Sequence, residues 1–232
     1  SAHTLASQVG LEILRKGGNA IDAAIATQFA LAVVYPGAGN LGGGGFLVAK
    51  LATGETLTLD FREKAPAAAH RDMYLDEKGN LNMDLCQYGH LASGVPGTVA
   101  GMIAAHRYAK LPFGELVQPA ITLAEKGFVI NAAEAQSLNH NQEAFKKYNT
   151  RIPAFLKSGG WKEGDTLRQT DLAATLKRIR DRGRKGFYEG ETARLILQEM
   201  ERGKGMISAK DLKNYEAKWR EPVVFPYKGY SI

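Results

Sequence analysis

Arg62 is the side chain in this sequence whose setting suggests a chemical use most directly. It stands in the run Asp60-Phe-Arg-Glu63, immediately after a segment that is typical of a strand. A guanidinium presents a planar fork of donors that matches a carboxylate, and a strand aims it from a rigid element. The alternative is a structural salt bridge to Asp60 or Glu63. The pattern therefore predicts either a carboxylate-binding arginine or a local ion pair.

A glycine-rich stretch, residues 33–50, raises a second chemistry. It contains Gly37-Ala-Gly-Asn-Leu-Gly42, which has the spacing of the dinucleotide-phosphate fingerprint. That fingerprint needs a strand before the first glycine and a helix after the third, because the helix N-terminus attracts the pyrophosphate. Here a helical pattern ends at Pro36, a hairpin pattern follows, and no Gly-Lys-Ser/Thr sequence completes a Walker motif. We therefore expect a steric role, in which the glycines let a strand or a ligand approach the backbone closely.

The remaining nucleophiles and potential ligands are too scattered to predict a site. Cys86 is the only cysteine and is expected to be a small, half-buried residue, with His90 four positions away by chance. Ser1 is a formal N-terminal nucleophile, but it precedes a predicted surface helix and is expected to be a truncation or cleavage point. The histidines lack the spacing of a metal site, so neither a metal nor a cofactor is expected. They are His3, His70, His90, His106 and His140.

Length and composition fit an ordinary globular protein. The 232 residues are 44% apolar and 23% charged, which suits a single domain over residues 1–232. The net charge of +6 is densest in residues 177–185, beside an apolar stripe at helical spacing formed by Leu172, Leu176 and Ile179. This pattern indicates a solvated helix face, and no nucleic-acid partner is expected. No apolar run reaches the roughly 18 residues of a membrane span, and no signal-peptide pattern is visible.

The elements that must position these residues follow an α+β order. Periodicity and capping residues predict helices first, then a hairpin, then more helices and terminal strands. The hairpin comprises residues 45–50 and 55–61, residues 62–94 are predicted to be irregular, and residues 219–232 to form strand, turn and strand. Helices are predicted over residues 4–16, 19–34, 96–108, 114–126, 170–181 and 191–201, and from Asn131 and Ser208 onward.

Four longer motifs give the chain a specific resemblance. They are Gly17-Gly-Asn-Ala-Ile-Asp-Ala-Ala24, Pro36-Gly-Ala-Gly-Asn-Leu-Gly-Gly-Gly-Gly-Phe46, Asp60-Phe-Arg-Glu-Lys-Ala-Pro66 and Ala92-Ser-Gly-Val-Pro-Gly-Thr-Val-Ala-Gly101. Shorter matches continue in order as far as Tyr227-Lys-Gly-Tyr230, so the similarity runs through essentially the whole chain. By these motifs the chain resembles the large subunit of the γ-glutamyltranspeptidase family.

The resemblance implies the αββα sandwich of the N-terminal-nucleophile hydrolases, with this chain as the large-subunit part only, truncated before the small-subunit nucleophile. In the family, a precursor cuts itself into a large and a small subunit. The new N-terminal threonine of the small subunit attacks the γ-glutamyl amide of compounds such as glutathione, with its own α-amine as base. The γ-glutamyl ester then passes to water or to an acceptor amine. No catalytic residue is therefore expected in this chain.

One site residue follows from the resemblance, which implies that Arg62 binds the α-carboxylate of the γ-glutamyl group. Related chemistries stay open: a cephalosporin-type acylase, an oxamate-type amidohydrolase or a poly-γ-glutamate transpeptidase. A nucleotide-binding module at residues 37–42 and a binding protein that has lost catalysis are alternatives of other classes. The expected partners are the small subunit, a small-molecule γ-glutamyl substrate and an acceptor amine, and the expected location is periplasmic or secreted.

Overall fold

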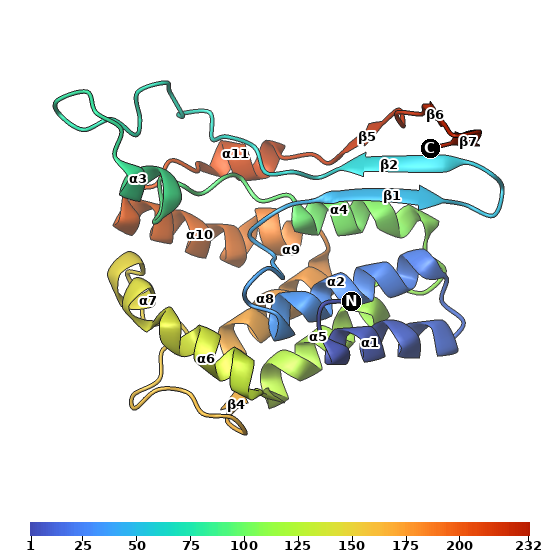
Figure 1. Cartoon of the computed structure of the whole chain (residues 1–232), viewed down its shortest axis with the longest axis horizontal. Helices are drawn as coiled ribbons and strands as arrows, with labels where there is room; N and C mark the ends of the chain where they lie inside the picture. Colours follow the sequence, from blue (N-terminus) through green and yellow to red (C-terminus); the bar gives the residue numbers. More distant parts are fainter.

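A computed structural model describes residues 1–232. Its helical layer is built around α2. Because α2 is apolar on nearly all sides, it is buried as predicted, with α1, α4 and α5 packed around it and α8 against α5 (Figure 1). These helices are α1 (Thr4–Arg15), α2 (Ala20–Val34), α4 (Thr98–Ala105), α5 (Phe113–Lys126) and α8 (Thr170–Arg182). None of the helices has the length and apolar character needed to cross a bilayer.

The start of α2 is fixed by two side chains. Asn19 caps the helix through the backbone N–H groups of Ile21 and Asp22, and the Asp22 carboxylate accepts from the N–H of Asn19. The same carboxylate is fully buried and also accepts from the N–H groups of Lys110 and Leu111. Burial alone would raise the pKa of Asp22, but these backbone hydrogen bonds outweigh it and lower the pKa. The capping box thus ties α2 to the segment that leads into α5.

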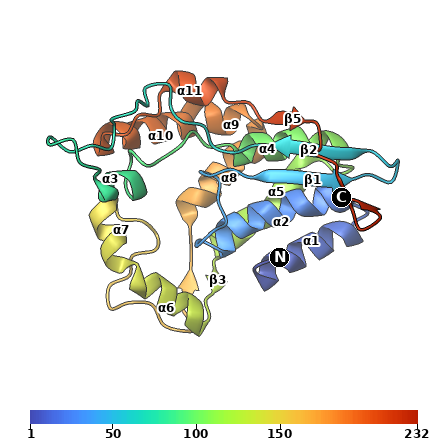
Figure 2. The ribbon, with the colours of Figure 1, turned by 45° about the horizontal axis from the view of Figure 1, so that its top comes forward.

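A three-stranded antiparallel sheet lies along one side of the helices, as Figures 1 and 2 show. β2 (Thr56–Asp60) is central, between β1 (Phe46–Lys50) and β5 (Lys218–Arg220). Leu57 and Leu59 of β2 are buried on the side of α4, whereas Phe46 and Val48 of β1 are 63% and 72% exposed. The sheet therefore has one covered face and one open face.

Smaller elements complete the chain. The pair β3–β4 and helices α6 and α7 lie at one end of the molecule, while α9, α10 and α11 lead back to β5 (Figure 1). Their bounds, with the short helix η1 and the terminal hairpin, are α3 (Met83–Gln87), η1 (His106–Tyr108), β3 (Phe128–Val129), α6 (Ala132–His140), α7 (Gln142–Tyr148), β4 (Thr166–Leu167), α9 (Lys185–Tyr188), α10 (Gly190–Gly203), α11 (Ala209–Asn214), β6 (Pro226–Tyr227) and β7 (Tyr230–Ser231).

The α+β class, the hairpin and the eight predicted helices are confirmed, with ends shifted by a few residues. The prediction for residues 219–232 is wrong in detail. Val223 to Phe225 lie in no strand, and the terminal hairpin is the short pair β6–β7, while Trp219 belongs to β5 beside β2. The sequence also missed α3, α7, α9 and the pair β3–β4. All of these are short, and a segment of a few residues shows too little periodicity to be predicted.

Candidate functional site

Arg62 lies two residues beyond the end of β2, on the surface. Its side chain is 63% exposed, and its guanidinium makes no hydrogen bond to another residue. The nearest acid is Glu63, whose Oε2 lies 3.6 Å from Arg62 Nε and is itself buried without a hydrogen-bond partner. The planar donors of the guanidinium are thus open to solvent just beyond the end of β2. A carboxylate from outside the chain can reach it and make two parallel hydrogen bonds.

The Asp60 carboxylate pairs with the Arg220 side chain and not with the Arg62 side chain. Its Oδ2 accepts from Arg220 Nη2 and Nε at 2.7 and 3.2 Å, and its Oδ1 accepts from the backbone N–H of Arg62 at 3.0 Å. The hydrogen bond from Arg220, followed by the one from the Arg62 N–H, lowers the pKa of Asp60. Asp60 therefore holds the Arg62 backbone and does not pair with the Arg62 side chain, whose one ion pair is the 3.6 Å contact with Glu63.

Four glycines surround the residue before Arg62. Gly44 and Gly97 are so close to the Phe61 carbonyl oxygen, and Gly101 to the Phe61 side chain, that a Cβ on any of them would overlap these atoms. A Cβ on Gly45 would lie 2.9 Å from the Phe61 ring. The steric role predicted for the glycine run is therefore confirmed for Gly44 and Gly45, with Gly97 and Gly101 completing the enclosure.

The two glycine motifs are also joined by hydrogen bonds. The backbone N–H groups of Gly97 and Thr98 donate to the Gly43 carbonyl oxygen at 2.7 and 3.0 Å. Asn40 Oδ1 accepts from the Gly43 N–H at 3.0 Å and from the Thr98 hydroxyl at 2.6 Å. Of the glycines in the fingerprint spacing, Gly37 and Gly42 have open space where a Cβ would stand, whereas a Cβ on Gly39 would overlap the Leu31 carbonyl group of α2. The segment after Gly42 is a strand, so the helix that a dinucleotide site requires is not in place.

We call this assembly the Arg62 corner: Asp60, Phe61 and Arg62, the four glycines, Arg220, and Tyr215, whose hydroxyl donates to the Arg62 carbonyl oxygen at 2.6 Å. Two of these contributors come from the C-terminal part of the chain and were missed by the sequence analysis. Tyr215 and Arg220 lie more than 150 positions from Arg62. Neither carried a local signal, because their role depends on β5 pairing with β2.

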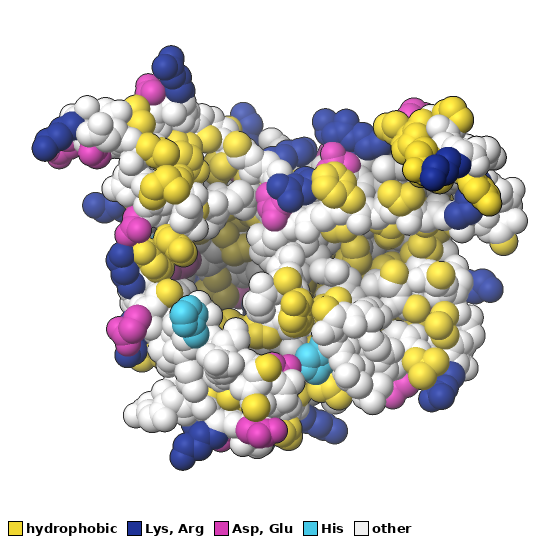
Figure 3. Space-filling view, in the orientation of Figure 1, with side chains coloured by type: hydrophobic (Ala, Val, Ile, Leu, Met, Phe, Trp, Pro, Cys, Tyr) yellow, Lys and Arg dark blue, Asp and Glu magenta, His cyan; other side chains and the backbone are white.

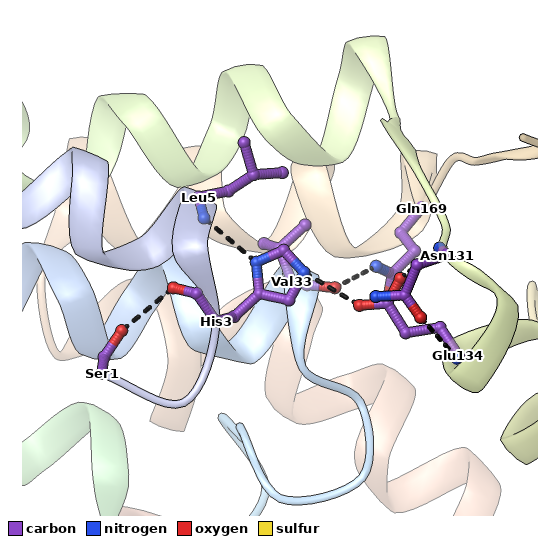
Figure 4. Close-up of polar contacts among 7 residues, drawn as sticks. All are labelled: Ser1, His3, Leu5, Val33, Asn131, Glu134 and Gln169. Atoms are coloured by element: carbon purple, nitrogen blue, oxygen red, sulfur yellow. Dashed lines mark hydrogen bonds and ion pairs between the residues drawn. The ribbon is translucent and has the colours of Figure 1, made fainter.

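A pocket of about 520 Å³ lies elsewhere, between the N-terminal residues and α6. His3 Nε2 contacts Glu134 Oε1 at 2.9 Å, and His3 Nδ1 accepts from the Leu5 N–H at 3.2 Å (Figure 4). Glu134 also closes the capping box of Asn131, so His3 and Glu134 each cap a helix and also bond to each other. We call the pocket between the N-terminal residues and α6 the His3 pocket.

The face of the molecule that Figure 3 shows has a hollow near its centre.

The other sequence candidates are not brought together. Cys86 is half-buried, as expected, and its thiol contacts the Met83 carbonyl oxygen, while His90 bonds to Glu199 at 2.9 Å. The Ser1 hydroxyl donates to the His3 carbonyl oxygen (Figure 4) and also contacts the Ser7 hydroxyl at the surface. No group of three or more His, Cys, Asp or Glu side chains has the geometry to hold a metal ion. Lys and Arg are spread over the face in Figure 3, with Asp and Glu beside many of them.

The chain matches the family described as Gamma-glutamyltranspeptidase over residues 6–232. It is 45% identical to the glutathione hydrolase proenzyme of Escherichia coli strain K12, covering all of this chain and 40% of that protein. It also covers 67% of the crystallised chain of the γ-glutamyltranspeptidase of Helicobacter pylori, with a TM-score of 0.97 and 50% identity. A third relative is the acylase ACY 1 proenzyme of Pseudomonas sp. strain V22, at 38% identity, covering 99% of this chain and 43% of that protein. The chain thus spans about 40% of the length of these curated relatives.

Proposed function

The chain belongs to the γ-glutamyltranspeptidase family, and on this premise we propose that it is the large-subunit part of an enzyme that cleaves γ-glutamyl amides such as glutathione. Its fold is the large-subunit part of the αββα architecture of N-terminal-nucleophile hydrolases. Within it, Arg62 binds the α-carboxylate of the γ-glutamyl group. The observation that carries this assignment is an exposed guanidinium, free of hydrogen bonds, on a backbone that is held on both sides.

The reaction is completed by a partner chain. The curated relatives are proenzymes, and we propose a small subunit from the same precursor, whose N-terminal threonine attacks the γ-glutamyl carbonyl while its α-amine takes the proton. The γ-glutamyl ester formed on that threonine is released to water or to an acceptor amine. Residues 1–232 act as one domain that supplies the binding arginine and no catalytic group.

The open face of the sheet supports this arrangement. Phe46 and Val48 project from it, and the Arg62 corner lies at its edge. A second sheet packed on this face would cover the two apolar side chains and would bring a nucleophile towards Arg62. A substrate held by its α-carboxylate would then present its γ-carbonyl to the partner.

Activity of the complete precursor tests the proposal. The full-length protein should mature into two chains and release p-nitroaniline from γ-glutamyl p-nitroanilide. A variant with alanine in place of the small-subunit threonine is the control for background hydrolysis. A correctly matured enzyme that leaves γ-glutamyl substrates intact would overturn the proposal.

The similarity to an acylase proenzyme supports a second candidate, amide hydrolysis of an acyl group without an α-amino acid end. The two candidate activities can be distinguished by comparing one pair of substrates. A γ-glutamyl anilide carries the α-carboxylate that Arg62 would bind, whereas a butyryl anilide has the same acyl chain without the α-amino and α-carboxyl groups. Preference for the butyryl compound would favour the acylase.

The location of the enzyme is also part of the proposal. We place it in the periplasm or outside the cell, where γ-glutamyl compounds can be scavenged. Activity measured in separated periplasmic, secreted and cytoplasmic fractions of the source cells tests this placement, and activity confined to the cytoplasmic fraction would contradict it.

A further inference from the structure

We propose that Tyr215 is a positioning residue for Arg62, and that its buried hydroxyl, through the Arg62 carbonyl oxygen, sets the direction in which the guanidinium meets the substrate carboxylate. The inference rests on the proposed function, since it takes Arg62 as the carboxylate-binding group. Tyr215 follows α11 and is 153 positions from Arg62, and its hydroxyl donates to Arg62 O at 2.6 Å.

The Tyr215 side chain is itself held from several directions. It is 2% exposed, and its ring stacks on the ring of Tyr188 with the planes 2° apart. The Arg184 guanidinium donates to the Tyr215 carbonyl oxygen at 2.8 Å, and Lys64 Nζ lies 5.0 Å from the centre of the Tyr215 ring. A buried ring that is fixed by stacking and by its own backbone cannot follow a moving partner, so its hydroxyl is a fixed point for the Arg62 carbonyl.

The hydroxyl is also kept in the form that donates. Burial, with the nearby charges of Asp60 and Glu63, raises the pKa of Tyr215 to about 12. The phenol therefore keeps its proton at any pH at which the enzyme would work. Since a carbonyl oxygen only accepts, the hydrogen bond between Tyr215 and Arg62 has one available direction.

The two peptide groups that flank the Arg62 Cα are thus both anchored. Asp60 accepts from the N–H on one side, Tyr215 donates to the C=O on the other, and the glycines leave no room for Phe61 to move. With φ and ψ fixed in this way, only the side-chain torsions of Arg62 stay free. Less conformational freedom is then lost when the carboxylate binds, which is the usual effect of preorganisation on affinity.

Gly97 is part of the same arrangement of contacts around Arg62. A Cβ there would overlap both the Phe61 carbonyl oxygen and the Tyr215 hydroxyl. The hydroxyl therefore reaches Arg62 through a gap that only glycine leaves open. A tyrosine hydroxyl without a positioning role would not require glycine at position 97.

The test replaces the hydroxyl alone, in the complete enzyme matured from its precursor. Tyr215→Phe should raise KM for γ-glutamyl p-nitroanilide by about threefold to tenfold, the loss expected for one hydrogen bond, with kcat within about twofold of the parent because the nucleophile is on the partner chain. The matched control is Tyr74→Phe, which removes a hydroxyl that donates to the Leu91 carbonyl oxygen at 3.3 Å and contacts no residue of the Arg62 corner. It should leave KM unchanged.

Two further measurements distinguish positioning from general loosening. The decarboxy substrate, 4-aminobutyryl p-nitroanilide, has no α-carboxylate, so Tyr215→Phe should leave its kcat/KM unchanged. In an Arg62→Ala background, Tyr215→Phe should have no additional effect on KM, since it acts through the absent side chain. If Arg62→Ala leaves KM unchanged, the proposed function fails. If Arg62→Ala raises KM and Tyr215→Phe does not, or if Tyr74→Phe raises it equally, only the positioning role is overturned.

Discussion

The Arg62 corner and the His3 pocket differ in what their polar groups are already bound to. The His3 pocket is the more enclosed region and contains a histidine beside a glutamate, yet His3 and Glu134 bond to each other and to helix ends. The Arg62 corner is open, yet its guanidinium makes no hydrogen bond while the backbone on either side of it is fully held.

This difference shows that donors free of hydrogen bonds, as on Arg62, indicate the binding group in this chain better than a concave surface does. A ligand at the His3 pocket would have to displace bonds that stabilise α1 and α6, whereas a carboxylate at Arg62 would break no hydrogen bond of the guanidinium. The four predictions below test this contrast, starting with the change that should have the largest effect.

Arg62→Ala should have the largest effect on substrate binding. Loss of a charge-assisted contact costs about 1.5–3 kcal/mol, which corresponds to a KM for γ-glutamyl p-nitroanilide raised by about 10- to 150-fold. The melting temperature should stay at that of the parent, because the side chain is 63% exposed. A matched control is Arg71→Ala, since Arg71 is 95% exposed and likewise lies beside a neighbouring acid, with 3.7 Å between Nε and Asp72 Oδ1. Equal effects of the two changes would contradict a specific role for Arg62.

Gly97→Ala should have the next largest effect, and on stability as well as on binding. Its Cβ would force the Phe61 carbonyl and the Tyr215 hydroxyl apart, and overpacking of this kind typically costs about 1–3 kcal/mol. Urea unfolding of the complete enzyme measures the loss, and KM should rise with it.

Gly37→Ala is the control for this change, since open space surrounds its Cβ position. The substitution should change stability by less than about 0.5 kcal/mol. A large cost at Gly37 and none at Gly97 would mean that the fingerprint glycines, rather than the enclosure of Phe61, carry the function of this region.

The glycines also show how far the sequence could predict the site. Arg62, the strand before it and the steric role of the glycine run, confirmed at Gly44 and Gly45, followed from local pattern and from the ordered motifs. Gly97 lay in a predicted helix start, and its contact with Phe61 depends on how α4 packs under β2. Tyr215 could not be predicted at all, because its hydroxyl bonds to a residue 153 positions away and its ring packs on Tyr188. Local chemistry is readable from sequence, but the contacts that anchor it are set by tertiary packing.

His3→Ala should have a smaller effect, confined to stability. The change removes the N-cap of α1 and the bond to Glu134, and loss of a cap costs about 0.5–2 kcal/mol. KM for the γ-glutamyl anilide should stay within error of the parent. His3→Asn keeps a side chain that is favourable at an N-cap and should recover much of the loss. A rise in KM with either variant would show that the His3 pocket takes part in substrate binding.

The smallest expected effect is the pH dependence that Asp60 gives to the Arg62 corner. Hydrogen bonds from Arg220 and from the Arg62 N–H lower the pKa of Asp60 below its ordinary 3.8. As the pH falls, the unfolded chain therefore takes up this proton before the folded one does, so the stabilisation is complete above 3.8 and is lost as pH falls through the lower folded value.

Melting temperatures of the parent and of Asp60→Asn between pH 6 and pH 2 should accordingly differ most at the upper end and converge at the lower. Arg220→Ala removes the largest cause of the shift and brings the folded pKa of Asp60 closer to 3.8, so the pH-dependent loss of stability should be smaller than in the parent and complete at a higher pH. A constant difference between parent and Asp60→Asn across the range would mean that Asp60 does not hold the Arg62 backbone as a charged acceptor. The Arg62 corner would then be organised by Tyr215 and the glycines alone.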